Sequence, residues 1–212
     1  MSDMNEKMKQ LVIAGDGAML GTVIQLALDT GASASDILEE ALLPAMDVVG
    51  QRMKTGEMFI PEVLLSAKTM QSGLEILTPL LGEGESVSAG TCVIGTVEGD
   101  LHDIGKNLVG MMLEGSGFKV VDLGIDVKQA DFAKAIEESG ADILGMSALL
   151  TTTMPKMKAT IQHLAELGLR DKVKILVGGA PVTAQYAKDI GADGYGFNAA
   201  DAVEKAKEFV AG

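Results

Sequence analysis

The sequence predicts an α/β protein in which a helical bundle precedes a doubly wound parallel sheet. Apolar residues repeat at intervals of three and four along the first part of the chain, whereas short aliphatic runs alternate with helical stretches along the rest. A segment rich in Gly, Ser and Glu, residues 81–90, separates the two patterns as a linker would. We therefore expect a helical domain over residues 1–84, a linker over 85–90 and a second domain over 91–212.

The helical domain is expected to contain four helices. Residues 20–28, 37–53 and 63–77 carry apolar stripes at helical spacing, and residues 4–14 form a weaker fourth helix. Ser35 and Asp36 are the candidate cap of the helix that includes residues 37–53. Four helices with short joints pack as a small bundle.

The second domain alternates strands with helices. Strands are expected at 91–97, 119–123, 142–146, 174–177 and 194–196, and helices at 104–115, 129–139, 154–167, 183–190 and 200–210. This alternation is typical of βαβ units and of a parallel sheet covered on both faces. Such a domain is flavodoxin-like and binds its ligands beyond the carboxyl ends of the strands.

Composition and charge exclude several classes of protein. The chain is 47% hydrophobic and 3% aromatic with no Trp, so the core of this globular protein must be aliphatic and Met-rich. A net charge of −13 argues against nucleic acid and anionic membranes as partners. The single cysteine, Cys92, excludes an intramolecular disulfide and suits a reducing compartment. With no signal peptide and no apolar stretch of membrane-spanning length, we expect a cytoplasmic protein.

The loop after the first expected strand contains the most informative residues of the chain. Asp100, His102 and Gly105 form an Asp-x-His-x-x-Gly pattern there. A carboxylate two residues before a histidine can accept a hydrogen bond from one ring nitrogen, which fixes the tautomer and leaves the other nitrogen free to bind a metal. In most proteins such a pair is only a loop hydrogen bond, so the metal interpretation needs support from elsewhere in the chain.

Two further loops are expected to meet this one at the same edge of the sheet. The first runs from Ser147 to Thr153 after the third strand and is rich in hydroxyl groups. The second begins with Gly178 and Gly179 after the fourth strand, where missing side chains let a ligand approach the backbone. Either loop alone would be an ordinary cap or turn. All three together predict a ligand site at the carboxyl edge of the sheet.

The three loops resemble the cobalamin-binding signature of corrinoid proteins that carry methyl groups, including the corresponding module of methionine synthase. The resemblance implies that the dimethylbenzimidazole tail of cobalamin leaves the cobalt and that His102 replaces it as lower axial ligand, the base-off/His-on form. Asp100 would hold the imidazole. The hydroxyl of Thr153, with Thr151 nearby, would complete a proton relay. This position is Ser in methionine synthase, so the hydroxyl is retained.

The resemblance also implies which residues contact the cofactor. Ser147, Leu149, Gly178 and Gly179 would line a slot for the tail, and Gly105 would leave it room. The whole set expected in this domain is Asp100, Leu101, His102, Asp103, Ile104, Gly105, Ser147, Leu149, Thr151, Thr153, Gly178, Gly179 and Ala180.

The stretch of residues 54–63 resembles the helical cap of the same proteins. There the bundle covers the upper, methyl-bearing face of the corrin, which implies Phe59 as cap residue and Met58 and Val63 or Leu64 as its neighbours. The residues alone also allow a simpler interpretation, in which Phe59 only staples the entrance of a helix.

The function implied by the resemblance is that of a methyl carrier that is not an enzyme on its own. A donor-specific methyltransferase would place the methyl group on cobalt, an acceptor-specific one would pass it to tetrahydrofolate or coenzyme M, and a reductive activase would be a third partner. Residues 81–90 would be the hinge that lets the cap move. Methanol, methylamines, betaines and methoxy-aromatics all remain open as donors, and the oligomeric state is open too.

Three other classes of protein fit parts of this pattern. The cobalamin subunit of a carbon-skeleton mutase shares the three loops but is not expected to carry the helical domain. A cobalamin-dependent sensor or regulator would need a DNA-binding segment, and the chain has no basic helix. An ordinary flavodoxin-like binding module would leave the three loops as coincidence.

Overall fold

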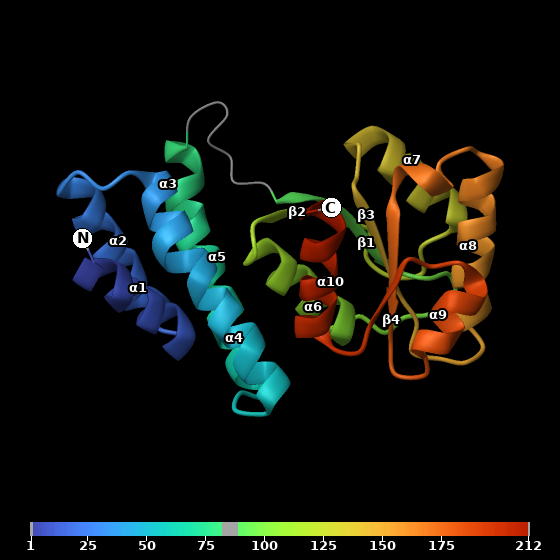
Figure 1. Cartoon of the computed structure of the whole chain (residues 1–212), viewed down its shortest axis with the longest axis horizontal. Coiled ribbons are helices and arrows are strands. Elements are labelled where there is room, and N and C mark those ends of the chain that lie inside the picture. Colours follow the sequence, from blue (N-terminus) through green and yellow to red (C-terminus); the bar gives the residue numbers. More distant parts are fainter. Residues whose placement is uncertain (1, 82–88, 212) are drawn as a thin grey trace. The chain divides into compact units, whose positions relative to one another are not determined.

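The computed structural model describes residues 2–81 and 89–211. The chain divides into two compact units, Met1–Ser88 with Glu114–Gly117 and Ala89–Leu113 with Phe118–Gly212 (Figure 1). The predicted linker and hinge fall largely on residues 82–88, which lie outside the described residues. Within the described parts of the chain, no helix has both the length and the apolar character needed to cross a membrane.

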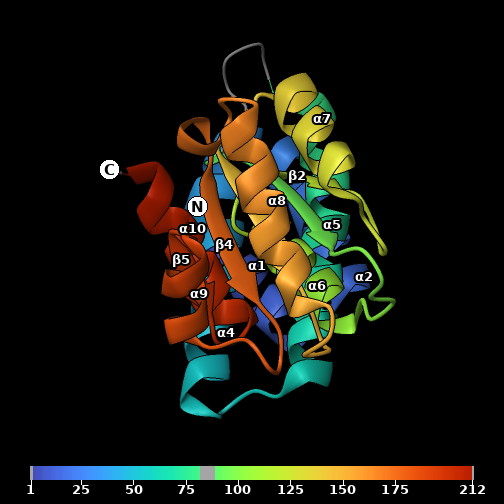
Figure 2. The same cartoon turned by 90° about the vertical axis from the view of Figure 1, so that its right-hand side faces the viewer.

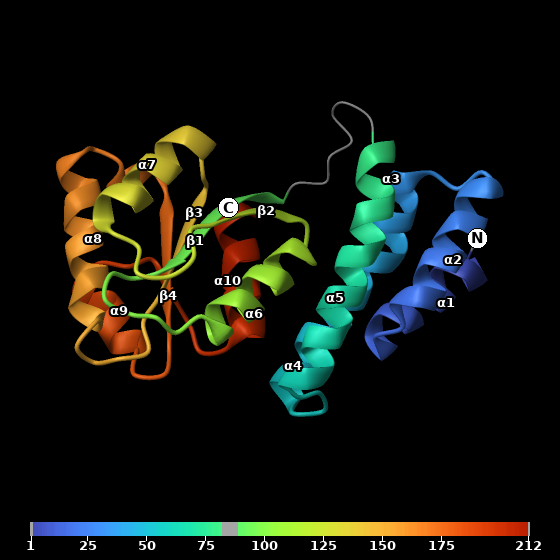
Figure 3. The same ribbon diagram turned by 180° about the vertical axis from the view of Figure 1, so that it is seen from behind.

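The first unit is a bundle of amphipathic helices. Its elements are α1 (Ser2–Ala14), α2 (Gly17–Asp29), α3 (Ala34–Ile37), the π-helical turn η1 (Leu38–Leu42), α4 (Leu43–Thr55), α5 (Ile60–Leu77) and the 3₁₀ turn η2 (Thr78–Leu80). Helix α5 packs against α1, α2 and α4, as Figure 3 shows from behind. Most of the buried side chains of these helices are aliphatic or Met, as the composition predicts, and Ser66 and Thr69 of α5 are buried among them.

The helix predicted from the stripe at residues 37–53 is interrupted. Its N-cap is Ser33, whose side chain accepts from the backbone N–H of Asp36, so the predicted cap at Ser35 and Asp36 is wrong. At η1 the N–H of Leu43 donates to the carbonyl of Leu38, five residues back. Pro44 has no N–H, so the carbonyl four residues before it has no helical donor, and a wider turn accommodates the gap.

The second unit is a parallel sheet of five strands. The strands are β1 (Gly90–Thr96), β2 (Phe118–Asp122), β3 (Ile143–Ser147), β4 (Lys174–Gly178) and β5 (Gly194–Gly196), in the order β2-β1-β3-β4-β5. This is the doubly wound, flavodoxin-like order, so the predicted α/β fold is confirmed. All strand pairs are parallel, so every strand ends at one edge, toward which the β4 arrow points in Figure 2.

Helices cover both faces of this sheet. They are α6 (Ile104–Glu114), α7 (Gln129–Ser139), α8 (Met154–Glu166), α9 (Ala184–Ile190) and α10 (Ala199–Ala211), with a 3₁₀ turn η3 at Arg170–Lys172. Figure 1 shows α7, α8 and α9 on one face and α6 and α10 on the other. The core beneath the first group joins Val93, Leu144 and Val177 of the strands to Phe132 and Leu164 of the helices.

Candidate functional site

The loop that leaves β1 is held on both sides by neighbouring segments. The N–H of Val97 donates to the carbonyl of Ser147 at 3.0 Å, and Val97 also pairs with Val127 in a β-bridge. The buried hydroxyl of Thr96 donates to the carbonyl of His102 at 2.9 Å, which closes the loop back onto the end of its own strand. The path of residues 97–103 is therefore set by hydrogen bonds.

Asp100 is fully buried in this loop and accepts five hydrogen bonds. Its Oδ1 accepts from the N–H of His102 at 3.1 Å and from His102 Nδ1 at 2.7 Å. Its Oδ2 accepts from Thr153 Oγ1 at 2.7 Å and from the N–H groups of Leu149 and Leu150 at 2.8 and 3.3 Å. One carboxylate thus joins the β1–α6 loop to the β3–α8 loop.

The hydrogen bonds also fix the ionisation of Asp100. Burial raises the pKa of its carboxyl group. The hydrogen bonds from Thr153, His102 and the Leu149 N–H lower the pKa by more than burial raises it, so the pKa lies well below its ordinary value. An ionised carboxylate can only accept, so His102 Nδ1 must carry its proton. In the neutral ring, Nε2 then bears the lone pair. The His102 side chain is 51% exposed, and none of the described residues is hydrogen-bonded to Nε2.

Thr153 stands between two acceptors. Its Oγ1 lies 2.7 Å from Asp100 Oδ2 and 2.9 Å from the carbonyl of Leu150, and its hydroxyl carries a single proton. The proton can therefore face either oxygen without movement of the heavy atoms. Thr151, the other predicted hydroxyl, is exposed, and among the described residues no hydrogen bond of its side chain is found. The structure therefore brings Asp100 together with Thr153 rather than with Thr151.

Small residues lie next to these loops, at the ends of the adjacent strands. Thr96 pairs with Ser147, Ser147 with Gly178, and Gly178 with Gly196, so four strands end side by side. A Cβ atom added to Gly105 would meet no atom within 4 Å, so this side of the loop is open.

Gly179 is required by the fold itself. Its φ is +130°, and a Cβ there would lie 1.9 Å from the carbonyl oxygen of Ala148. Close approach of two loops, rather than contact with a ligand, therefore explains this glycine. The next residue, Ala180, is exposed in the turn before α9.

Exposed apolar side chains lie at the same edge. Leu101, Ile104 and Leu149 are exposed, the first two by 67% and 76%. Phe197, which the sequence prediction missed, follows the last residue of β5 and is 78% exposed. Its place directly after a strand was a signal that could have found it, since the other candidate residues follow strands too. Large exposed apolar side chains that gather at one edge are typical of a ligand-binding or interaction surface.

The remaining candidates have local structural roles. Asp103 accepts from Asn107 Nδ2 at 3.0 Å at the start of α6. Phe59 belongs to the helical unit, is 68% exposed and precedes α5, where its N–H donates to Glu62 Oε2. Its predicted neighbours Met58 and Val63 are buried within that unit. The role of Phe59 as a cap stays a prediction. His163, the second histidine, lies on α8 with its Nδ1 3.7 Å from Glu166 Oε2.

Comparison with known proteins agrees with these features. One model of a B12 binding domain matches residues 90–204, and a second matches residues 4–78. A corrinoid protein of Desulfitobacterium hafniense (strain Y51) is 46% identical over 208 residues, which cover 97% of this chain and 96% of that protein. The dimethylamine corrinoid protein of Methanosarcina barkeri is 49% identical over 178 residues, 84% of either chain.

A solved structure extends the similarity to both units. The crystal structure of the methanol:cobalamin methyltransferase complex from Methanosarcina barkeri matches with a TM-score of 0.89 at 32% identity, covering 99% of this chain and 80% of that chain. The similarity therefore includes the helical unit as well as the sheet. This chain belongs to the methyl-carrying corrinoid proteins of the B12-binding family.

Proposed function

We propose that this protein carries a methyl group on cobalamin between two methyltransferases, one specific for the donor and one for the acceptor, and that His102 Nε2 is the lower axial ligand of the cobalt. When bound, cobalamin supplies a cobalt atom that accepts the methyl group and gives it up again. The observation that carries the proposal is the pair of His102 with buried, ionised Asp100. That pair holds the imidazole in the tautomer a metal needs.

The residues of the site fit cobalamin. Nε2 of His102 is free of hydrogen bonds to described residues, so it can replace the nucleotide base in the base-off/His-on form. Apolar side chains such as Leu101, Ile104 and Phe197 can cover part of a large, mostly apolar ring system. The open side of Gly105 and the small residues Ser147 and Gly178 leave space for the displaced tail.

Asp100 and Thr153 would manage a proton at His102. Nδ1 already carries a proton, so a second proton would have to enter at Nε2 whenever this nitrogen is not bound to a metal. Asp100 remains ionised and stabilises the resulting imidazolium at 2.7 Å. The Thr153 hydroxyl can turn between Asp100 and the Leu150 carbonyl, which lets the hydrogen-bonding of the carboxylate adjust to the charge of the ring.

Methylamines are the first donors to test. The dimethylamine corrinoid protein of Methanosarcina barkeri is 49% identical to this chain over 178 residues, which supports a methylated amine as the donor. The donor is selected by the partner methyltransferase in this proposal. The acceptor would be tetrahydrofolate or coenzyme M, and a reductive activase would restore the carrier. Phe59 of the helical unit would cover the methyl-bearing face.

The experiment is reconstitution of the purified protein with hydroxocobalamin, followed by removal of unbound corrinoid and a visible spectrum. We expect about one corrinoid per chain and the spectrum of a histidine-ligated cobalt. In His102→Ala this spectrum should be lost, whereas His163→Ala, the matched control in a chain with two histidines, should leave it unchanged. Equal spectra in wild type and His102→Ala would refute the axial-ligand assignment.

A further inference from the structure

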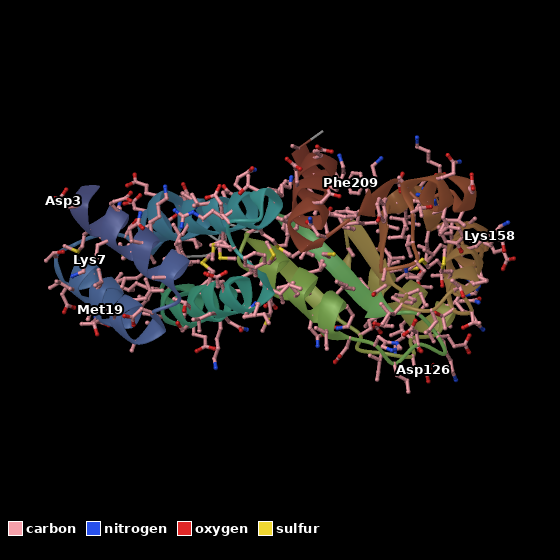
Figure 4. The ribbon with its side chains drawn as sticks, turned by 90° about the horizontal axis from the view of Figure 1, so that it is seen from below. Asp3, Lys7, Met19, Asp126, Lys158 and Phe209 are labelled. Atoms are coloured by element: carbon pink, nitrogen blue, oxygen red, sulfur yellow. The ribbon has the colours of Figure 1, made fainter. Side chains whose placement is uncertain are left out.

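Asp126 has a backbone conformation that side chains rarely adopt. Its φ is +55°, and it is the one non-glycine residue with positive φ in the parts of the chain that the structure describes. Figure 4 labels it at the edge of the second unit, in the loop between β2 and α7. Asp and Asn tolerate this region better than other residues, and such conformations gather at functional sites.

Two hydrogen bonds connect Asp126 to the loop that contains Asp100. Its N–H donates to the carbonyl of Asp100 at 3.1 Å, and its Oδ1 accepts from the N–H of Gly99 at 2.7 Å. The N–H of Gly99 belongs to the Glu98–Gly99 peptide group and the carbonyl of Asp100 to the Asp100–Leu101 peptide group, so Asp126 holds the main chain on both sides of the Gly99–Asp100 peptide. The left-handed conformation lets the main chain and the side chain of one residue reach these two peptide groups.

Neighbouring bonds extend this contact into a short ladder. The carbonyl of Gly124 accepts from the Thr96 N–H at 3.0 Å, and the N–H of Val127 donates to the Thr96 carbonyl at 3.0 Å. Asp126 supplies the next contact beyond these, at the point where the chain turns toward the buried carboxylate of Asp100.

We propose that Asp126 is a positioning residue that fixes the main chain of Asp100 and, through it, the ring of His102. The proposal rests on the proposed function, in which His102 is the axial ligand. The side chain of Asp100 is short, so the five hydrogen bonds that it accepts can form together only if the Cα of Asp100 is correctly placed. Asp126 would set that placement from the side opposite the β3–α8 loop.

Three substitutions separate the contributions of Asp126. Asp126→Asn keeps a tolerated left-handed residue and a neutral acceptor for Gly99. Asp126→Gly keeps the backbone conformation and the N–H donor but removes the acceptor. Asp126→Ala removes the acceptor and adds strain. Asp131→Ala, at an exposed carboxylate in the first turn of α7, is the matched control.

The first readout needs no cofactor. The chain has two histidines, so the imidazole ¹⁵N–¹H spectrum of the apo-protein contains two ring systems, and His163→Ala assigns them. In wild type and Asp131→Ala, His102 should show a protonated, hydrogen-bonded Nδ1. In Asp126→Gly and Asp126→Ala this signal should weaken or exchange rapidly, while Asp126→Asn retains it.

The second readout is the fraction of bound cobalamin that is histidine-ligated. Loss of a charge-assisted hydrogen bond predicts an equilibrium constant for ligation that is about tenfold lower in Asp126→Gly, and lower still in Asp126→Ala. In Asp126→Asn the same equilibrium constant should fall by about threefold or less. If Asp126→Gly unfolds, Asp126→Asn and Asp126→Ala still test the order of effects.

The outcomes are distinct. Wild-type values of both readouts in Asp126→Gly would overturn the positioning role. A wild-type apo-protein that shows the His102 Nδ1 signal, with the expected order among the variants, but binds no cobalamin would support the positioning role and refute the proposed function instead.

Discussion

Replacing Asp100 by Asn should move the proton of His102 to the wrong nitrogen. The Oδ2 position of Asp100 faces three donors, from Leu149, Leu150 and Thr153, whereas the Oδ1 position faces two donors of His102. An Asn side chain has one oxygen and one NH₂ group, and the oxygen is expected on the side with three donors. The NH₂ group then faces the imidazole, so Nδ1 must accept and Nε2 carries the proton.

The size of the effect follows from the bonds that are lost. To free Nε2, the variant must give up the bond from its Asn NH₂ group to Nδ1, and neutral hydrogen bonds of this kind contribute about 0.5–1.5 kcal/mol. Because about 1.4 kcal/mol corresponds to a factor of ten, axial ligation should weaken roughly 2- to 10-fold. The N–H of His102, left opposite another donor, should lower the free energy of unfolding by about 1–3 kcal/mol.

Two measurements on the purified protein test this reasoning. Denaturant unfolding of the apo-protein gives the loss of stability, and the visible spectrum with excess hydroxocobalamin gives the histidine-ligated fraction. Asp189→Asn is the matched control, since it makes the same change of charge at an exposed carboxylate of α9. If Asp100→Asn ligates cobalt as fully as the wild type, the tautomer argument is wrong.

Three further predictions concern other parts of the site. The hydrogen bonds that hold the pKa of Asp100 below its ordinary value of 3.8 stabilise the fold fully above that pH and progressively less as the pH falls below it. Thr153→Val removes one of these hydrogen bonds, so denaturant titrations should show a free energy of unfolding that is lower by about 1–2 kcal/mol at neutral pH. The free energy of unfolding should also fall less on acidification than in the wild type, whereas Thr153→Ser should resemble the wild type. Gly179→Ala should lower the free energy of unfolding, measured by thermal unfolding, by about 3 kcal/mol or more, because the added Cβ overlaps a backbone carbonyl. Gly191→Ala, at a position with φ +81° and open space around it, should lower it by about 1 kcal/mol. Phe197→Ala should change the free energy of unfolding by less than about 0.5 kcal/mol because the ring is exposed, yet weaken cobalamin binding about tenfold in an equilibrium titration; unchanged binding would remove Phe197 from the site.

The sequence predicted the fold well where hydrophobic periodicity is strong. The helix α7 begins and ends at the predicted residues, and each of the five strands lies within a residue or two of its prediction. Periodicity reports which side chains are buried, and these elements are held by burial. It does not report backbone hydrogen bonds, so the cap at Ser33 and the π-helical turn before Pro44 were missed. Both depend on which N–H meets which carbonyl.

The site was predictable to the extent that it follows from strand ends. Asp100, His102 and Thr153 come from loops that must meet in a parallel sheet, and the structure brings them within hydrogen-bonding distance. Asp126 was not predictable in this way, because its hydrogen bonds to Gly99 and Asp100 depend on a φ angle that no residue pattern encodes. Phe197 follows a strand of three residues, too short to draw attention to the residue after it.

The five hydrogen bonds of Asp100 also bear on the entropy of cofactor binding. Two loops from distant parts of the sequence are joined by one carboxylate, through hydrogen bonds that are all made within this chain. Their conformational freedom is given up during folding, so it does not reduce the affinity for the cofactor later. The imidazole is thus presented as a preorganised ligand, and the apo-protein and the loaded protein should share the same loop structure. Under the proposed function, each partner methyltransferase would then meet the same surface around His102.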